Sequence, residues 1–163
     1  MLSQRRLTWW QKPLFAFAAS RLGGWYFLNV GSRLDPVLMR ISGGRWNSGM
    51  GQPVGILKIR GAKSGLMREL PLLCIPEGDG YIVVASRTGH PKHPAWYYNL
   101  RANPEIRLLI HGKEEAFIAH EAAGEERAEL WRKAVWFYPG YAVYQQRAGE
   151  RVIPVLLVRP VIS

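Results

Sequence analysis

From Val54 to Ser86 the chain reads VGILKIRGAKSGLMRELPLLCIPEGDGYIVVAS, and this stretch decides the fold. Apolar and β-branched residues fill three short runs, and glycine-rich segments separate the runs. Runs of this kind, bounded by turn residues, are typical of β-strands joined as hairpins. We therefore predict strands over residues 54–60, 67–75 and 81–86, with turns over residues 61–65 and 77–80.

The residues that follow add helices and further short strands. Ala128, Trp131, Val135 and Tyr138 recur at steps of three and four, which predicts one apolar face of a helix. Pro154 indicates an edge or irregular position for the last strand. We predict a helix over residues 93–101, strands over 105–111 and 115–120, a helix over 125–138 and a strand over 151–159.

About six short strands, mostly joined as hairpins, predict a mainly β fold of the α+β type, a small antiparallel barrel with inserted and appended helices. A doubly wound sheet is disfavoured because the strands do not alternate with long helices. The apolar runs begin at residue 54, so we predict a domain over residues 54–163. Residues 1–53 are predicted to be a helical arm followed by a linker.

The arm itself has three interpretations. A cleaved secretory signal is disfavoured because the apolar run over residues 14–19 is short and Arg21 follows it at once. The aromatic residues and arginines of residues 1–28 suit a helix lying on an anionic membrane surface. They equally suit a helix packed on the domain's own core, and both interpretations stay open. A second helix is predicted over residues 33–39, and the glycine-rich segment 42–53 reads as the linker.

The charge balance points to an anionic partner. Twenty-two basic residues face 12 acidic residues, which leaves a net charge of +10 over 163 residues. Such a field attracts nucleic acid, anionic lipid or a small phosphorylated or carboxylated molecule. Nucleic acid is disfavoured because no run of Lys or Arg exceeds two residues and no standard recognition motif is present. The single cysteine, Cys74, lies in an apolar run and is expected to be buried, which fits a reducing cytosol.

The turn Gly61-Ala62-Lys63-Ser64-Gly65 is not a Walker A loop, because Ala62 separates Gly61 from Lys63 and the context is strand–turn–strand. We expect it to offer backbone N–H groups, one ammonium and one hydroxyl, which suit a phosphate or carboxylate. A solvated basic hairpin turn fits the same residues, and both interpretations stay open.

The sequence contains no motif that indicates acid–base, nucleophilic or metal catalysis by side chains. His90 and His93 have no neighbouring Cys or carboxylate ligands, so we expect no metal site. A bound cofactor would therefore carry any difficult chemistry. Tyr138, Tyr141 and Tyr144 are spaced by three, so on a helical backbone they would line a cavity or pack in the core.

Two longer strings carry a family resemblance. The pattern RGAKSGxxRxxPL from Arg60 and the pattern ASxxGxxxxPxWYxNLxANP from Ala85 resemble the deazaflavin-dependent nitroreductase family. The strings EERAELW, YPGYxxY and IPV continue the likeness in order, so that it covers about residues 54–160. The resemblance implies a split β-barrel of the FMN-binding-like type, coenzyme F420 as the cofactor, and hydride transfer to a quinone or related acceptor.

The resemblance also assigns roles to residues. Ser86, near the reactive edge, and the tyrosines 138, 141 and 144 on the substrate side would be the catalytic residues. The cofactor would be bound by Lys63, Ser64, Gly65, Arg68, Pro71, Ser86, Arg87, Thr88, Trp96 and Asn99.

Two departures from the family pattern bear on the expected activity. Ala62 stands where the family usually has Arg, so one phosphate contact is lost unless Arg60 or Arg87 compensates. Leu73 stands where some members of the family have an aromatic residue, which favours quinone over nitroimidazole reduction. An FMN-dependent oxidoreductase and a non-catalytic F420 or lipid binder are the alternatives. We expect a monomer or homodimer that is cytoplasmic or peripheral at the inner face of the plasma membrane.

Overall fold

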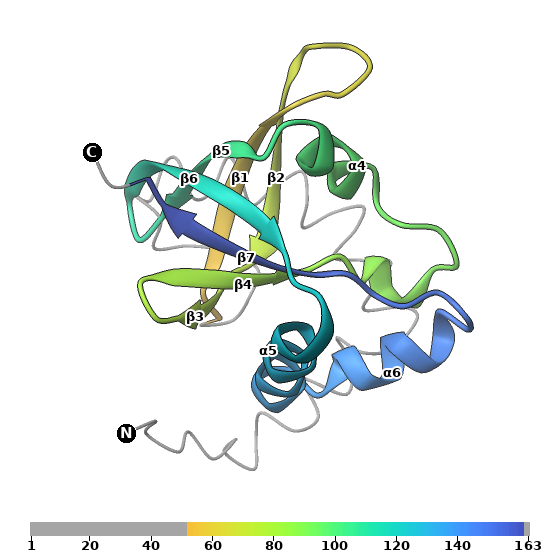
Figure 1. Cartoon of the computed structure of the whole chain (residues 1–163). Helices are drawn as coiled ribbons and strands as arrows, with labels where there is room; N and C mark the ends of the chain where they lie inside the picture. Colours follow the sequence, from red (N-terminus) through yellow and green to blue (C-terminus); the bar gives the residue numbers. More distant parts are fainter. Residues whose placement is uncertain (1–51, 162–163) are drawn as a thin grey trace.

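The computed structural model describes residues 52–161. Within them, β2 (Met67–Leu73) and β3 (Ile75–Glu77) are separated only by Cys74, yet they form opposite edges of one seven-stranded sheet. The strand order is β2-β1-β5-β6-β7-β4-β3, and neighbouring strands pair antiparallel. For consecutive strands to occupy both edges, the sheet must curl round on itself, and it does so as a split barrel (Figure 1). The predicted fold class is confirmed.

The bend at Cys74 corrects the single strand that we predicted over residues 67–75. The last strand also differs from expectation, because β7 lies inside the sheet between β6 and β4. Pro154 precedes β7, and its carbonyl accepts a hydrogen bond of 3.0 Å from the N–H of Ala85. The remaining strands are β1 (Val54–Arg60), β4 (Gly80–Val84), β5 (Glu105–Ile110), β6 (Lys113–Glu121) and β7 (Val155–Pro160).

In the described part of the chain, three α-helices and one short 3-10 turn connect the strands. They are η2 (Arg87–Gly89), α4 (Ala95–Ala102), α5 (Gly124–Phe137) and α6 (Gly140–Arg147). In Figure 1, α4 lies beside the end of the barrel that carries the β1–β2 turn, while α5 and α6 lie below β3 and β4.

Helix α5 turns most of the predicted face inward, since Trp131, Val135 and Tyr138 pack against the core, but its most buried residues lie beside that face. Leu130 and Ala134 are buried in it, whereas Ala128 is exposed. Helix α6 was not predicted as an element.

The sheet separates two hydrophobic clusters. Alternate residues of β7 point to opposite faces, as the period of two requires. Leu156 and Val158 therefore pack inside the barrel, while Val155 and Leu157 pack against α5 and α6. Both faces of this strand are buried, which explains why its sequence is a continuous apolar run.

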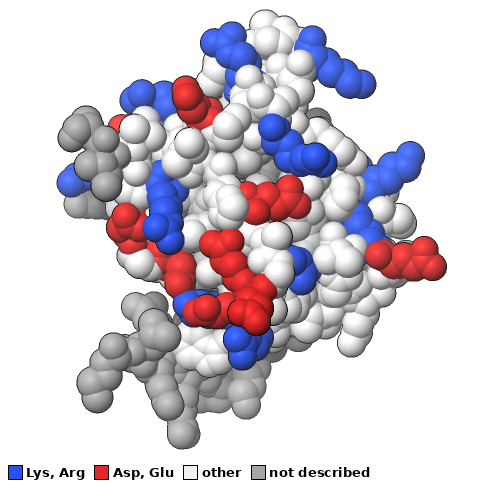
Figure 2. Space-filling model, in the orientation of Figure 1, with Lys and Arg blue, Asp and Glu red and all other residues white. Residues whose placement is uncertain are grey.

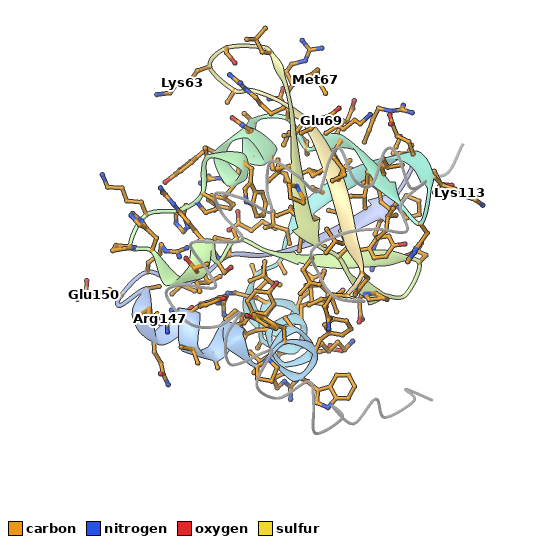
Figure 3. All side chains as sticks on the ribbon, turned by 180° about the vertical axis from the view of Figure 1, so that it is seen from behind. Lys63, Met67, Glu69, Lys113, Arg147 and Glu150 are labelled. Atoms are coloured by element: carbon orange, nitrogen blue, oxygen red, sulfur yellow. The ribbon has the colours of Figure 1, made fainter. Side chains whose placement is uncertain are left out.

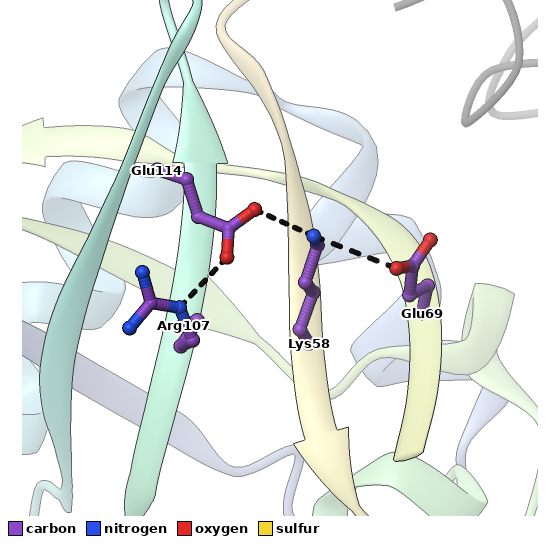
Figure 4. Close-up of polar contacts among 4 residues, drawn as sticks. All are labelled: Lys58, Glu69, Arg107 and Glu114. Atoms are coloured by element: carbon purple, nitrogen blue, oxygen red, sulfur yellow. Dashed lines mark hydrogen bonds and ion pairs between the residues drawn. The ribbon is translucent and has the colours of Figure 1, made fainter. Parts of the chain in front are cut away.

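A ladder of charged side chains crosses four strands on the outside of the barrel (Figure 4). The Nζ of Lys58 lies 2.5 Å from Glu114 and 3.6 Å from Glu69, and the Nε of Arg107 lies 2.7 Å from Glu114. Hydrogen bonds from Lys58 and then Arg107 lower the pKa of the Glu114 carboxyl. Exposed pairs of this kind contribute about 0.2–1 kcal/mol each, so their main effect is to favour one register among the strands.

The predicted N-terminal arm over residues 1–28, the helix over residues 33–39 and nearly all of the linker lie outside the described residues. Within residues 52–161, no helix is both long enough and apolar enough to cross a lipid bilayer.

Candidate functional site

The turn between β1 and β2 is closed by its own hydrogen bonds. The N–H of Gly61 donates to the carbonyl of Leu66 at 2.8 Å, and the N–H of Gly65 donates to the carbonyl of Gly61 at 2.9 Å. The N–H of Leu66 donates to the Ser64 hydroxyl at 3.4 Å. The backbone of the turn is thereby held in one shape.

Helix α4 holds the same turn from outside. The N–H of Ala62 donates to Oδ1 of Asn99 at 3.0 Å, and Nδ2 of Asn103 donates to the carbonyl of Arg60 at 3.2 Å. With these bonds, the N–H groups of Gly61, Ala62, Gly65 and Leu66 are all used within the protein. The expectation of a backbone anion site at this turn is therefore wrong for most of its N–H groups, and attraction for an anion must come from side chains.

Three cationic side chains supply that attraction. Arg60, Lys63 and Arg68 are exposed, and none of them pairs with a carboxylate of residues 52–161. Figure 2 shows Lys and Arg side chains gathered at this end of the molecule, and in Figure 3 Lys63 projects from the tip of the turn. Uncompensated cations on a backbone that is itself fixed form a suitable site for a phosphate or carboxylate.

Two further predicted residues lie on the elements next to the turn, Trp96 on α4 and Pro71 on β2. Trp96, on α4, is half-buried and packs against the cluster inside the barrel. Pro71 lies on the edge strand β2 opposite Ile56 of β1. An edge strand tolerates proline because one side of its backbone has no neighbour to bond.

The loop after β4 has an unusual backbone. Arg87, Thr88 and Gly89 all have positive φ, at 46°, 52° and 82°. Non-glycine residues in this region cost about 1–2 kcal/mol each, and such strain gathers at functional sites. Gly89 could not be another residue, because an added Cβ would lie 2.6 Å from the carbonyl oxygen of Tyr144 on α6.

Arg151 spans this loop, and it was not among the site residues predicted from the sequence. Its Nη2 donates to the carbonyl of Ser86 at 2.7 Å, and its Nε donates to the carbonyl of His90 at 2.9 Å. Its Nη1 lies 3.1 Å from the carbonyl oxygen of Ala85 and 3.2 Å from Nδ1 of His93. Burial and then the charge of Arg87 lower the pKa of the Arg151 guanidinium.

The three predicted tyrosines come together although they belong to two different helices. Tyr138 caps the end of α5, whereas Tyr141 and Tyr144 lie on α6. The hydroxyls of Tyr138 and Tyr144 are 3.1 Å apart, and the rings of Tyr138 and Tyr141 meet edge to face with centroids 5.1 Å apart. Desolvation raises the pKa of all three phenols, so they stay protonated at neutral pH.

Helix α4 connects the two halves of the site. Its Asn99 and Asn103 hold the turn with Lys63, and its N-terminal end continues the loop that Arg151 spans. The guanidinium of Arg87 also donates to the carbonyl of His93, at 3.3 Å, directly before the helix. Cations at one end and neutral hydroxyls at the other suit an elongated ligand with an anionic tail.

Comparison with known proteins identifies relatives of this arrangement. A family model described as F420H(2)-dependent quinone reductase matches residues 33–160. A protein of Mycobacterium tuberculosis, named as a candidate F420H(2)-dependent quinone reductase, is 37% identical over 118 residues, covering 71% of this chain and 98% of its own.

Two solved structures are similar as well. One, titled an F420-H2 dependent reductase, is 42% identical with a TM-score of 0.61 over 66% of this chain and 94% of its own. The other, titled a domain-swapped dimer, is 37% identical with a TM-score of 0.63 over 78% of this chain and 97% of its own.

Proposed function

The chain belongs to the F420H(2)-dependent quinone reductase family, and from this premise we propose that it catalyses hydride transfer from reduced coenzyme F420 to a quinone. The observation that carries the proposal is the β1–β2 turn, where three cations face no carboxylate of the described residues while α4 fixes the backbone between them. F420 has a phosphate and glutamate carboxylates in its tail, so the chemistry of this donor set fits it.

Lys63 and Arg68 would bind the anionic tail, and Ser64 and Gly65 would shape the turn. Arg60 is the better of the two expected substitutes for the Arg that is absent at Ala62. Its Nη1 lies 3.4 Å from the carbonyl oxygen of Gly65, which keeps the guanidinium at the turn.

The deazaflavin ring of F420 would lie between the β1–β2 turn and the loop after β4. When bound in its reduced form, the cofactor supplies the hydride. Pro71, Arg87, Thr88, Trp96 and Asn99 would complete this side. Ser86 is the strongest of the proposed catalytic residues, because its carbonyl is fixed by Arg151 while no hydrogen bond within residues 52–161 occupies its hydroxyl. A hydroxyl that is carried by a fixed backbone and makes no internal hydrogen bond can donate to an acceptor oxygen as that oxygen gains charge.

The tyrosines would serve the quinone side. Tyr138 and Tyr144 share a hydrogen bond and have raised pKa values, so either one remains a neutral hydrogen-bond donor for an acceptor oxygen. A raised pKa opposes release of the phenolic proton, so water is the better source of the proton that the reduced quinone takes up. Tyr141 is almost wholly buried, and its ring packs on Tyr138 and near Trp131. We assign it the task of holding the ring of Tyr138 in place.

Binding and turnover test the proposal separately. Oxidised F420 and FMN are each titrated against the protein and followed by fluorescence quenching, and the absorbance of F420 is then followed as its reduced form reacts with menadione. We expect tighter binding of F420 than of FMN and turnover above the blank. No turnover at saturating cofactor would contradict the enzyme and favour a binding protein, and preference for FMN would favour the other alternative.

Assembly and location are further parts of the proposal. The similar domain-swapped dimer supports a homodimer here, which light scattering after gel filtration would detect. The aromatic and arginine-rich residues 1–28 support contact with an anionic membrane from the cytoplasmic side. Removal of residues 1–28 should abolish binding to vesicles that contain anionic lipid, and unchanged binding would contradict the contact.

A further inference from the structure

We propose that Arg151 is a positioning residue that holds the loop of residues 85–93 in the shape that binds the cofactor ring. The inference rests on the proposed function, since it concerns the loop that carries Ser86, Arg87 and Thr88. Arg151 itself would touch neither cofactor nor acceptor, and its effect would pass through the backbone.

Within residues 52–161, the hydrogen bonds of the guanidinium are all made to this one loop. Three of its four partners are main-chain carbonyls, those of Ala85, Ser86 and His90, at 3.1, 2.7 and 2.9 Å. The fourth is the ring of His93, at 3.2 Å. A planar fork with five donors can bridge both ends of a loop in this way, whereas the point charge of a lysine cannot.

The loop needs such support because only two hydrogen bonds within it join main-chain groups, and the other three use the side chains of Arg87, Thr88 and His90. Within it, the N–H of Gly89 donates to the carbonyl of Ser86, and the N–H of His90 donates to the carbonyl of Arg87, both at 3.0 Å. Against these bonds stand three consecutive residues with positive φ. Backbone strain of this size persists only where the surroundings enforce it.

The electrostatic setting also points to positioning. Arg151 is partly buried, and none of its partners in residues 52–161 is a carboxylate. The nearby charge of Arg87 repels it. A partly buried cation with a cationic neighbour and no acidic partner destabilises the folded protein, so stability alone does not explain its presence. An anionic ligand at Arg87 would relieve that repulsion.

His93 links Arg151 and the loop of residues 85–93 to the rest of the site. Because a guanidinium only donates, Nδ1 of His93 must accept, which requires a neutral ring. That ring also packs on the ring of Tyr97 in α4, with centroids 4.8 Å apart. Helix α4 also holds the β1–β2 turn that carries Lys63. Arg151 is therefore connected to both ends of the proposed cofactor site.

Arg127 provides a matched control. It too is a half-buried arginine that donates to a main-chain carbonyl, that of Ile153, at 2.9 Å, and its guanidinium lies over the ring of Trp131. It makes no contact with residues 85–93. If Arg151 only stabilises the fold, Arg151→Lys and Arg127→Lys should behave alike.

The experiment compares the wild type, Arg151→Lys and Arg127→Lys by melting temperature, F420 dissociation constant and amide hydrogen exchange of residues 85–93. We expect Arg151→Lys to weaken F420 binding by about tenfold or more, equivalent to about 1.4 kcal/mol, and to speed exchange in the loop. We expect Arg127→Lys to lower the melting temperature while leaving F420 affinity and loop exchange unchanged.

Two outcomes would contradict the positioning role of Arg151. Equal losses of affinity in the two variants, or faster loop exchange in Arg151→Lys with unchanged affinity, would overturn the positioning role. Should Arg151→Lys fail to fold, His93→Phe removes one partner of the guanidinium at a half-exposed position. It should then weaken F420 binding by about threefold, equivalent to about 0.65 kcal/mol, and unchanged affinity would overturn the proposal. If the wild type fails to bind F420, the proposed function is wrong. Amide hydrogen exchange of residues 85–93 still tests whether Arg151 holds the loop.

Discussion

Oδ1 of Asn99 on α4 accepts a hydrogen bond of 3.0 Å from the backbone N–H of Ala62, 37 residues earlier in the chain. This bond attaches the β1–β2 turn to the helix on the same side of the barrel (Figure 1). It uses the backbone of Ala62, so it does not depend on which side chain stands at that position. The direction in which Lys63 projects is therefore set by a helix distant in sequence. Two substitutions of Asn99 can separate this positional effect from the effect of charge.

Asn99→Ala should destabilise the fold by about 1 kcal/mol, because the N–H of Ala62 loses its acceptor. Asn99→Asp keeps an acceptor but places a negative charge beside Lys63. We expect the Asp variant to retain stability and to bind F420 more weakly. Denaturant unfolding and fluorescence titration measure the two effects. Equal stability of the Ala variant and the wild type would show that the bond contributes nothing.

Lys63→Glu should weaken F420 binding by about tenfold or more, because it reverses the charge at the proposed phosphate site. Lys113→Glu is the matched control. Lys113 is also exposed beside a hairpin turn, and Figure 3 shows that it lies at a different end of the molecule. The control changes the net charge equally and should leave affinity nearly unchanged. A similar loss in both variants would mean that the overall field, rather than a local contact, attracts the cofactor.

Gly89→Ala should destabilise the protein by about 2–4 kcal/mol. The new Cβ would lie 2.6 Å from the carbonyl oxygen of Tyr144, at a φ of 82° that alanine disfavours. Gly149→Ala shares the positive φ but meets no atom within 4 Å, so we expect about 1–2 kcal/mol there. Urea denaturation gives both values. Equal losses would show that conformation alone, without the packing of the loop on α6, accounts for the effect.

Stability should decrease in acid through His93. Burial and then Arg151 lower its folded-state pKa below the ordinary 6.5, with Arg101 acting in the same direction and Glu121 against it. The unfolded chain therefore binds the proton more readily. The contribution of neutral His93 is complete above pH 6.5 and is lost as the pH falls through the lowered folded pKa.

Urea midpoints measured across this range, for the wild type and for His93→Gln, isolate the effect from that of the other histidines. Glutamine can still accept from Arg151 but does not titrate. We expect the acid-dependent loss to be smaller in the variant. Parallel curves for the two proteins would rule out His93 as the source.

Cys74 should be unreactive in the native protein. Its side chain is inaccessible at the bend between β2 and β3, and burial raises the pKa of the thiol to about 12. Because the chain has one cysteine, Ellman's reagent gives an unambiguous result. We expect no reaction at mildly alkaline pH in buffer and one equivalent in denaturant. Rapid reaction in buffer would show that the bend opens readily.

Local patterns explain which elements were predictable. The strand over residues 54–60 and its glycine turn were correct because alternation and turn residues act within a few positions. The break at Cys74 was missed, since Leu72 to Ile75 is apolar throughout and the bend arises from joining two edges of the barrel. Helix α6 was missed because its buried face is covered by other elements of the fold, among them β7, and by the loop that contains Gly89.

Sequence patterns were sufficient to predict the hairpins, the excess of cations and the residues that carry the family resemblance. These follow from residue types and spacings that are readable over short stretches. The three-dimensional fold was needed to show that Asn99 holds Ala62, that the turn keeps few N–H groups for a ligand, and that Arg151 holds the loop at Ser86, 65 residues before it. Such bonds join a side chain to a distant main-chain carbonyl or N–H. Every residue except proline has both groups, so no residue type marks the partner in advance.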